Sequence, residues 1–104
     1  MKRPALIPEE VDTSHLTDDQ RRDRDAVIRT GRLGFGDRWQ SPFCAALSRA
    51  AGRRYDPQQL NHWLAGTRPV PDAVAPALRV MGPQLASELE RRAAELRELW
   101  KPDE

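Results

Sequence analysis

Amide side chains gather in one short stretch of the chain, from Gln58 to Asn61. An amide group offers both donors and an acceptor, so Gln and Asn can make paired hydrogen bonds to the edge of a base in the major groove of DNA. His62 follows directly and can also donate or accept there. Leu60 and Trp63 stand among these residues at helical spacing. The pattern indicates a helix with an apolar anchoring face and a polar face turned outward.

Local signals mark both ends of this helix. Asp56 followed by Pro57 is typical of a helix start, with a capping carboxylate and a proline in the first turn. Gly66 is typical of the residue that follows the last turn. We therefore expect a short helix from Pro57 to Ala65.

The rest of the chain also has helical periodicity, and no segment alternates with a period of two over a useful length. Start and stop signals predict five helices, at about residues 18–33, 42–51, 57–65, 72–82 and 83–100. The first starts from a capping-box pattern, Thr17 with Gln20, and the second from Ser41 followed by Pro42. The predicted fold class is all-α, a compact bundle of about five helices with a helix-turn-helix at its centre.

Three segments are expected along the chain. Residues 1–16 contain Pro4 and Pro8 and no sustained period, so they are predicted to be an arm that is ordered only if it docks. Residues 17–82 hold the central helices. Residues 83–104 form a C-terminal helix with Leu85, Leu89, Ala93, Leu96 and Trp100 on one stripe, which either packs on the bundle or pairs with another chain.

Composition excludes several classes of protein. With 104 residues and 38% hydrophobic content, the chain is one domain with a modest core. It has no apolar run long enough for a membrane helix and no secretory signal, so a cytoplasmic location is expected. Cys44 is the one cysteine, predicted to be a buried small hydrophobe, and only His15 and Cys44 could join His62 at a metal, without ligand spacing. We expect no metal, no cofactor and no catalytic residues.

Charge is segregated, although the formal net charge is only +1. Residues 1–28 and residues 69–104 each carry five basic and seven acidic side chains, whereas residues 29–68 carry seven arginines against two aspartates. Arginine suits bidentate contacts to phosphates and bases. The basic middle of the chain contains the amide-rich helix, which favours a nucleic-acid partner.

The run QSPFCAALSRAAG, followed by DPQQLNHWLAGTRPVP and an Ala/Val/Leu helix, resembles the lambda-repressor-like (Cro/Xre-type) helix-turn-helix of phage and bacterial regulators. The resemblance covers roughly residues 38–81. In that family a Gln often opens the second helix, a polar run opens the recognition helix, a bulky apolar residue and a Gly close it, and a basic residue follows. Those places are taken here by Gln40, by residues 57–59, by Trp63 with Gly66, and by Arg68. The connection from Gly52 to Pro57 is longer than the family usually has.

Together, the residues and the resemblance imply a set of roles. The residues expected to read bases are Gln58, Gln59, Asn61 and His62. Those expected to hold phosphates are Gln40, Arg53, Arg54, Tyr55 (as a hydrogen-bond donor) and Arg68. The predicted core of the motif is Phe43, Leu47, Leu60, Trp63 and Gly66.

The leading hypothesis is a sequence-specific regulator of transcription, a repressor that binds an inverted repeat in double-stranded DNA as a homodimer. The resemblance also implies a bacterial or phage origin and association with the nucleoid. The alternative is a helical interaction module, similar to an antitoxin or an adaptor, that binds a small protein through residues 84–100. An enzyme is the weakest reading, because no nucleophile, phosphate loop or metal cluster has plausible spacing.

Overall fold

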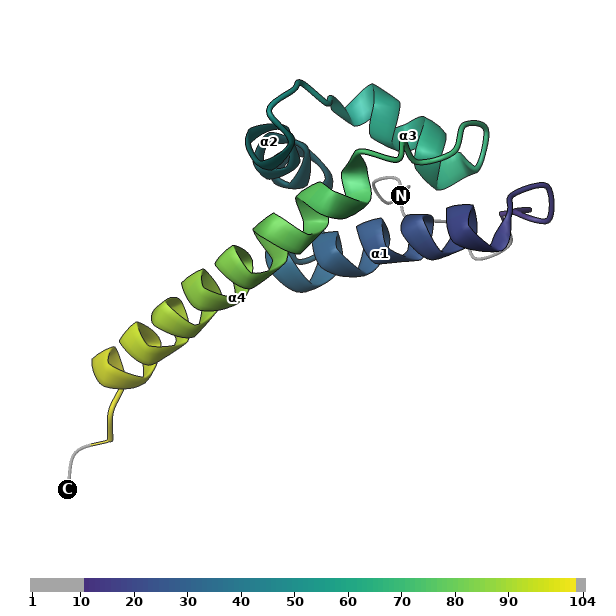
Figure 1. Cartoon of the computed structure of the whole chain (residues 1–104). Coiled ribbons are helices and arrows are strands. Elements are labelled where there is room, and N and C mark those ends of the chain that lie inside the picture. The colour runs from purple at the N-terminus through teal and green to yellow at the C-terminus, as the bar shows by residue number, and fades with distance from the viewer. Residues whose placement is uncertain (1–10, 103–104) are drawn as a thin grey trace.

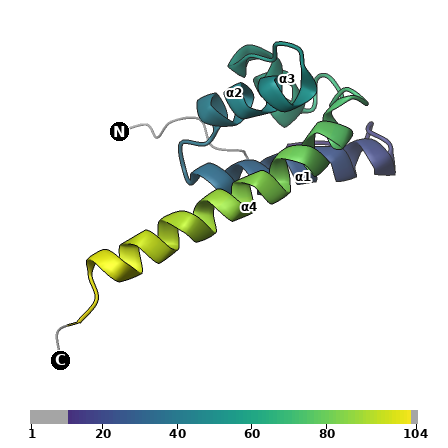
Figure 2. The ribbon, with the colours of Figure 1, turned by 60° about the vertical axis from the view of Figure 1, so that its left-hand side comes forward.

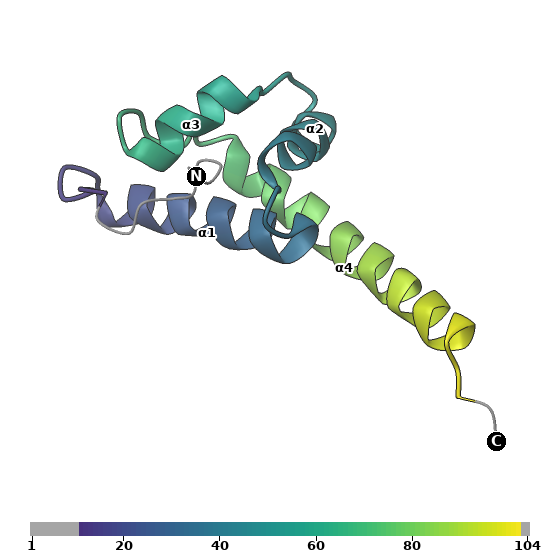
Figure 3. The ribbon, with the colours of Figure 1, turned by 180° about the vertical axis from the view of Figure 1, so that it is seen from behind.

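The computed structural model describes residues 11–102 and contains four helices within them. These are α1 (Asp18–Phe35), α2 (Gln40–Ala51), α3 (Pro57–Ala65) and α4 (Val74–Leu99). No strand occurs among the described residues, which confirms the all-α class. In Figure 1, α2 and α3 lie over α1, and α4 starts beneath α3, passes the end of α1 and continues away from the body. The turned views agree that the last turns of α4 stand clear of the other helices (Figures 2 and 3).

The prediction of a fifth helix that opens at Pro83 is wrong. A single helix, α4, runs through Gly82 and Pro83 to Leu99. Proline removes one backbone donor from a helix and clashes with the Cβ of the preceding residue. Here that residue is Gly82, which has no Cβ, so part of the clash is absent. The boundary predicted between residues 82 and 83 therefore falls inside one continuous element.

The start of α2 also differs from the prediction. The helix begins at Gln40, and the residue before it is Trp39, which makes no side-chain capping bond. Ser41 and Pro42 lie inside the first turn, where a proline costs little because that N–H has no helical partner. Trp39 is buried and packs edge-on against Phe43, with ring centroids 5.4 Å apart. A Cβ at Gly31 would come within 1.9 Å of the Trp39 ring, so α1 and this indole meet only because Gly31 has no side chain.

The core joins all four helices. Its largest fully buried side chains are Val27, Phe43, Leu47, Leu60 and Val74. Trp63 is 4% exposed, Cys44 is buried in the same core cluster, and Gly66 is a buried C-cap. All five residues predicted to form the core of the central motif are buried.

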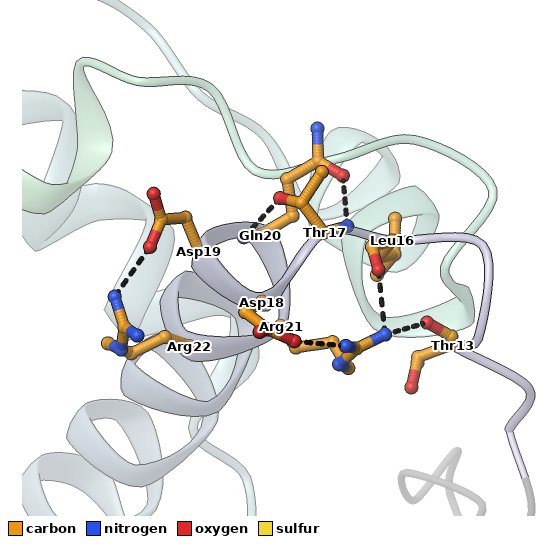
Figure 4. Close-up of polar contacts among 8 residues, drawn as sticks. All are labelled: Thr13, Leu16, Thr17, Asp18, Asp19, Gln20, Arg21 and Arg22. Atoms are coloured by element: carbon orange, nitrogen blue, oxygen red, sulfur yellow. Dashed lines mark hydrogen bonds and ion pairs between the residues drawn. The ribbon is translucent and has the colours of Figure 1, made fainter.

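The described part of the predicted arm, residues 11–16, docks on the body, and residues 1–10 lie outside the described residues. Leu16 is buried, and Thr17 forms the predicted capping box with Gln20, through bonds of 3.1 and 2.9 Å (Figure 4). The Arg21 guanidinium donates to the carbonyls of Thr13 and Leu16, at 3.0 and 2.7 Å. Asp18 and Asp19 pair with Arg21 and Arg22. The first turn of α1 thus holds the preceding segment in place.

Candidate nucleic-acid interface

Both ends of α3 are fixed by local chemistry. Asp56 accepts from the Gln59 N–H and Gln59 Oε1 accepts from the Asp56 N–H, each at 2.9 Å, a complete capping box. Pro57 occupies the first helical position. At the other end Gly66 has a φ of 79°, a left-handed conformation that favours glycine, and Ala65 is the last helical residue as predicted. The short helix therefore has defined limits before any tertiary contact is counted.

The polar and apolar faces of α3 separate as the sequence predicts. Leu60, Trp63 and Leu64 are buried, while Gln58, Gln59 and Asn61 are exposed and His62 is half-buried. The four amide and imidazole residues differ in whether their side chains already make hydrogen bonds within the protein. The Gln59 oxygen is used in the capping box, and His62 Nδ1 lies 3.1 Å from the Thr67 hydroxyl. Among the residues that the structure describes, the side chains of Gln58 and Asn61 make no hydrogen bond.

Tyr55 corrects one expectation. Its ring is 4% exposed and packs edge-on against Trp63, with centroids 5.5 Å apart. The hydroxyl is buried and has no hydrogen-bond partner within the described chain. A buried hydroxyl cannot reach a phosphate, so the predicted role of Tyr55 as a donor to DNA is wrong for this structure. Burial of the apolar ring stabilises the fold by more than burial of the hydroxyl costs, because an aromatic side chain removes a large apolar area from water.

Ser48 holds the connection between α2 and α3, and no pattern in the sequence points to it. The Tyr55 N–H donates to Ser48 Oγ at 2.8 Å, and this hydroxyl lies 2.7 Å from the Cys44 carbonyl. Gly52 ends α2 in the left-handed conformation, with a φ of 70°. The long connection is therefore held against the last turns of α2, and it turns Tyr55 inward.

Exposed arginines lie on the connections at both ends of α3. Arg53 and Arg54 lie on the connection before it and Arg68 on the one after it, and all three are exposed. Arg53 also lies over the Tyr55 ring, 5.5 Å from its centroid. Gln40 is half-buried at the start of α2, roughly 18 Å along the helix axis from the Arg53 end. Gln40 and the Arg53–Arg54 pair thus lie at opposite ends of α2, and Arg68 follows the far end of α3.

The seven arginines of the basic middle share one property. All are exposed, and none of them forms an ion pair with another described residue. They are Arg29, Arg32, Arg38, Arg49, Arg53, Arg54 and Arg68. By contrast, Arg21, Arg22, Arg91 and Arg92, from the acidic flanks, each have a carboxylate partner on their own helix. The positive charge of the middle segment is left without an internal counterion.

Two long-range contacts hold the C-terminal end of α3, and sequence reasoning missed both. The Arg24 guanidinium, on α1, donates through Nε and Nη2 to the Leu64 carbonyl, at 3.1 and 2.6 Å. His15 Nε2 lies 2.6 Å from the Gly66 carbonyl. Burial lowers the pKa of Arg24 from its ordinary value. These groups occupy carbonyls that the end of a helix leaves unpaired, and they orient α3 against the rest of the fold.

The Cys44 thiol is buried and stays protonated at neutral pH. It lies in the core, and burial, with a smaller effect of the Asp56 charge, raises its thiol pKa to about 11. The expectation of a buried small hydrophobe is confirmed.

No protein-family model matches this chain, and comparisons with curated proteins and with solved structures found no match either. Within the described residues no helix is long and apolar enough to cross a bilayer.

Proposed function

We propose that the protein is a sequence-specific DNA-binding regulator of the helix-turn-helix type, in which α2 and α3 form the motif and α3 lies in the major groove. It acts as a repressor and binds an inverted repeat as a homodimer. The observation that supports this most is the pair of opposite faces on α3. Three buried apolar side chains fix the helix, its other residues include exposed amides, and the connections at its two ends carry exposed arginines that have no internal counterion.

Each residue is assigned a role according to whether its side chain already makes a hydrogen bond within the protein. Gln58 and Asn61 have no internal hydrogen bond and are the primary base readers, since an amide can contact an adenine through two bonds. Gln59 retains its amide donors, and His62 reads bases only after it releases Thr67. Arg53, Arg54 and Arg68 hold phosphates, and their contacts make affinity depend on salt.

The first test is selection from a random DNA library at two salt concentrations, followed by sequencing of the retained DNA. An enriched inverted repeat with steeply salt-dependent affinity is the expected result. Weak retention without enrichment would contradict sequence-specific binding.

Substitutions then separate the two kinds of contact. Gln58→Ala should cost ~1–3 kcal/mol of binding free energy and relax the preference at one base position. Arg68→Ala should weaken binding to all sequences alike and reduce the salt slope by about one unit. Gln84→Ala and Arg91→Ala are matched controls on α4 and should leave both quantities unchanged. An unchanged base preference in Gln58→Ala would show that α3 does not read DNA in this register.

One observation favours a second candidate function, a helical interaction module that binds a small protein through residues 84–100. Leu96, Leu99 and Trp100 are 60%, 70% and 77% exposed at the end of α4. Solvent exposure of several large apolar side chains together marks a surface that binds something. Isolation of a stoichiometric complex with another protein, together with no salt-sensitive DNA binding, would support this candidate over the regulator.

A further inference from the structure

The apolar stripe of α4 begins beside α1 and continues beyond it. Leu85 packs against the core, Leu89 is 37% exposed, and Leu96 and Trp100 are mostly exposed. At 3.6 residues per turn these residues share one side of the helix, with Ala93 between Leu89 and Leu96. The distal half of α4 therefore carries an apolar face with no covering element in the described chain (Figures 2 and 3).

A hollow of about 220 Å³ lies where this stripe meets α1. Its lining is almost wholly apolar and includes Leu33 and Gly34 from α1 and Leu85 and Leu89 from α4. Leu33, which lines it, is 74% exposed. Because the hollow and the exposed stripe lie on the same side of α4, they form one continuous surface, which we call the α4 seam.

The charges beside the α4 seam are of two kinds. Glu88, Arg91, Arg92 and Glu95 satisfy one another through ion pairs of 2.6–3.1 Å. Glu90 and Arg97 have no ion-pair partner among the described residues. The two are seven residues apart, which is almost two full turns, so they lie on the same flank of the seam.

We propose that the α4 seam is occupied by α4 of a second copy of this chain, packed antiparallel about a two-fold axis at Ala93. Such an axis brings Leu89 to within one residue of the level of Leu96 of the second copy, and Glu90 to within one residue of the level of Arg97 of the second copy. Trp100 of the second copy reaches Leu85 and fills the hollow beside Leu33. A two-fold interface requires a self-complementary surface, and this seam has one in both its apolar and its charged residues.

Antiparallel packing is selected by these same residues. In a parallel symmetric pair each residue lies level with itself, so Glu90 would be level with Glu90 and Arg97 with Arg97. In the antiparallel pair opposite charges meet on the same flank, twice per dimer. The small Ala93 at the axis lets the two helices approach closely, while the leucines on either side pack around it.

This inference deepens the proposed function, because it identifies the surface through which the homodimer forms. It rests on the proposed function only for the biological use of the dimer. The association is measured without DNA, so its failure can be told apart from a failure of DNA binding. A monomer that still selects a DNA sequence would overturn the seam and keep the regulator; a dimer that selects none would do the reverse.

The first experiment is the mass in solution of the full chain, by light scattering across a range from about 1 to 100 µM. We expect a dimer for the parent chain, a monomer for Leu96→Glu, and a dimer for Ala94→Glu. Ala94 is exposed on the back of α4, so this control adds the same charge two residues away and outside the seam. A monomeric parent chain, or a Leu96→Glu variant that stays dimeric, would overturn the proposal.

Charge reversal tests the orientation. Glu90→Arg and Arg97→Glu should each weaken the dimer roughly tenfold, since each reverses two exposed pairs, and the double variant should recover most of the loss. Loss in the double variant equal to the product of the two single losses would overturn the antiparallel pairing.

Cross-linking locates the axis. Ala93→Cys should form a disulfide-linked dimer under mild oxidation, and Ala94→Cys should form far less. The buried Cys44 does not compete in either variant. Equal cross-linking of the two variants would place the axis elsewhere and overturn the proposed register.

Discussion

The polar face of α3 and the apolar face of distal α4 expose opposite kinds of side chain to solvent. On α3 the apolar residues are buried, and the arginines around the helix have no internal counterion. On distal α4 the charges pair with one another along the helix, and the apolar residues are left in solvent. Each region therefore leaves one kind of group without a partner in its own chain: arginine cations around α3 and apolar side chains on distal α4. A polyanion suits the first region and an apolar helix face suits the second.

The largest test of this contrast is the loss of a leucine from each region. Leu60→Ala should lower the free energy of unfolding by about 2–5 kcal/mol, because it leaves a cavity under α3. Leu96→Ala removes the same atoms from an exposed site and should change the stability of the isolated subunit by less than about 0.5 kcal/mol. Urea unfolding below the dimer dissociation constant, at concentrations where light scattering gives the mass of a monomer, measures both. Equal losses would show that distal α4 packs on its own chain.

The next effect is a pH dependence that arises from Cys44. Because its thiol pKa is raised in the fold, the thiol stabilises the native state below pH 9, and that stability is lost as the pH rises toward 11. The loss amounts to roughly 2 kcal/mol at pH 11. Comparison of the parent chain with Cys44→Ala at pH 7 and pH 10.5 isolates the contribution of this group. A parallel decline in the two proteins would mean that the α2 core admits the thiolate.

A smaller effect is expected from the capping box of α3. Asp56→Ala should cost about 1 kcal/mol, since it removes the acceptor for the Gln59 N–H, and Asp56→Asn should retain most of the stability. The bond from the residue 56 backbone N–H to the Gln59 oxygen remains in Asp56→Ala, but the start of α3 loses one of its two capping bonds. This variant should therefore alter DNA binding by more than Thr17→Ala, the equivalent change at α1. Paired urea unfolding and DNA titrations of both variants compare the two caps.

The smallest effect concerns the paired charges of distal α4. The hydrogen bond from Arg91 lowers the pKa of Glu88, so this carboxylate stabilises the helix above its ordinary pKa and stops doing so as the pH falls through the lowered value. In a Leu96→Glu background, Glu88→Gln should reduce the loss of helical circular dichroism between pH 7 and pH 2. Glu90→Gln is the matched control and should not, because Glu90 has no partner on its own helix.

Local signals predicted the part of the fold that depends on neighbours in sequence. The capping box at Thr17, the capping carboxylate of Asp56 and the stop at Gly66 were all predicted, because their partners lie within a few residues. The start of α2 was wrong by this same logic, since the packing of Trp39 on Gly31 outweighed the cap suggested by Ser41. Gly82 and Pro83 resembled a break for the same reason, although the helix continues.

The candidate site was predictable only in its outward face. The amides of α3 are exposed as expected, but the groups that hold the helix come from far along the chain. Arg24 is 40 residues from Leu64 and His15 is 51 residues from Gly66, and no local pattern reveals such contacts. Tyr55 illustrates the same limit, because its polar hydroxyl suggested a surface residue and its ring was decided by tertiary packing against Trp63.

Because α4 is long, the helical content of its last turns should depend on protein concentration. An isolated helical segment of about a dozen residues is marginal in water, and residues beyond Leu89 have only their own ion pairs to support them. On the proposed seam, each subunit would complete the final turns of the other. Helical content per chain should therefore fall when the protein is diluted below its dimer dissociation constant, because the last turns of α4 unfold in the monomer.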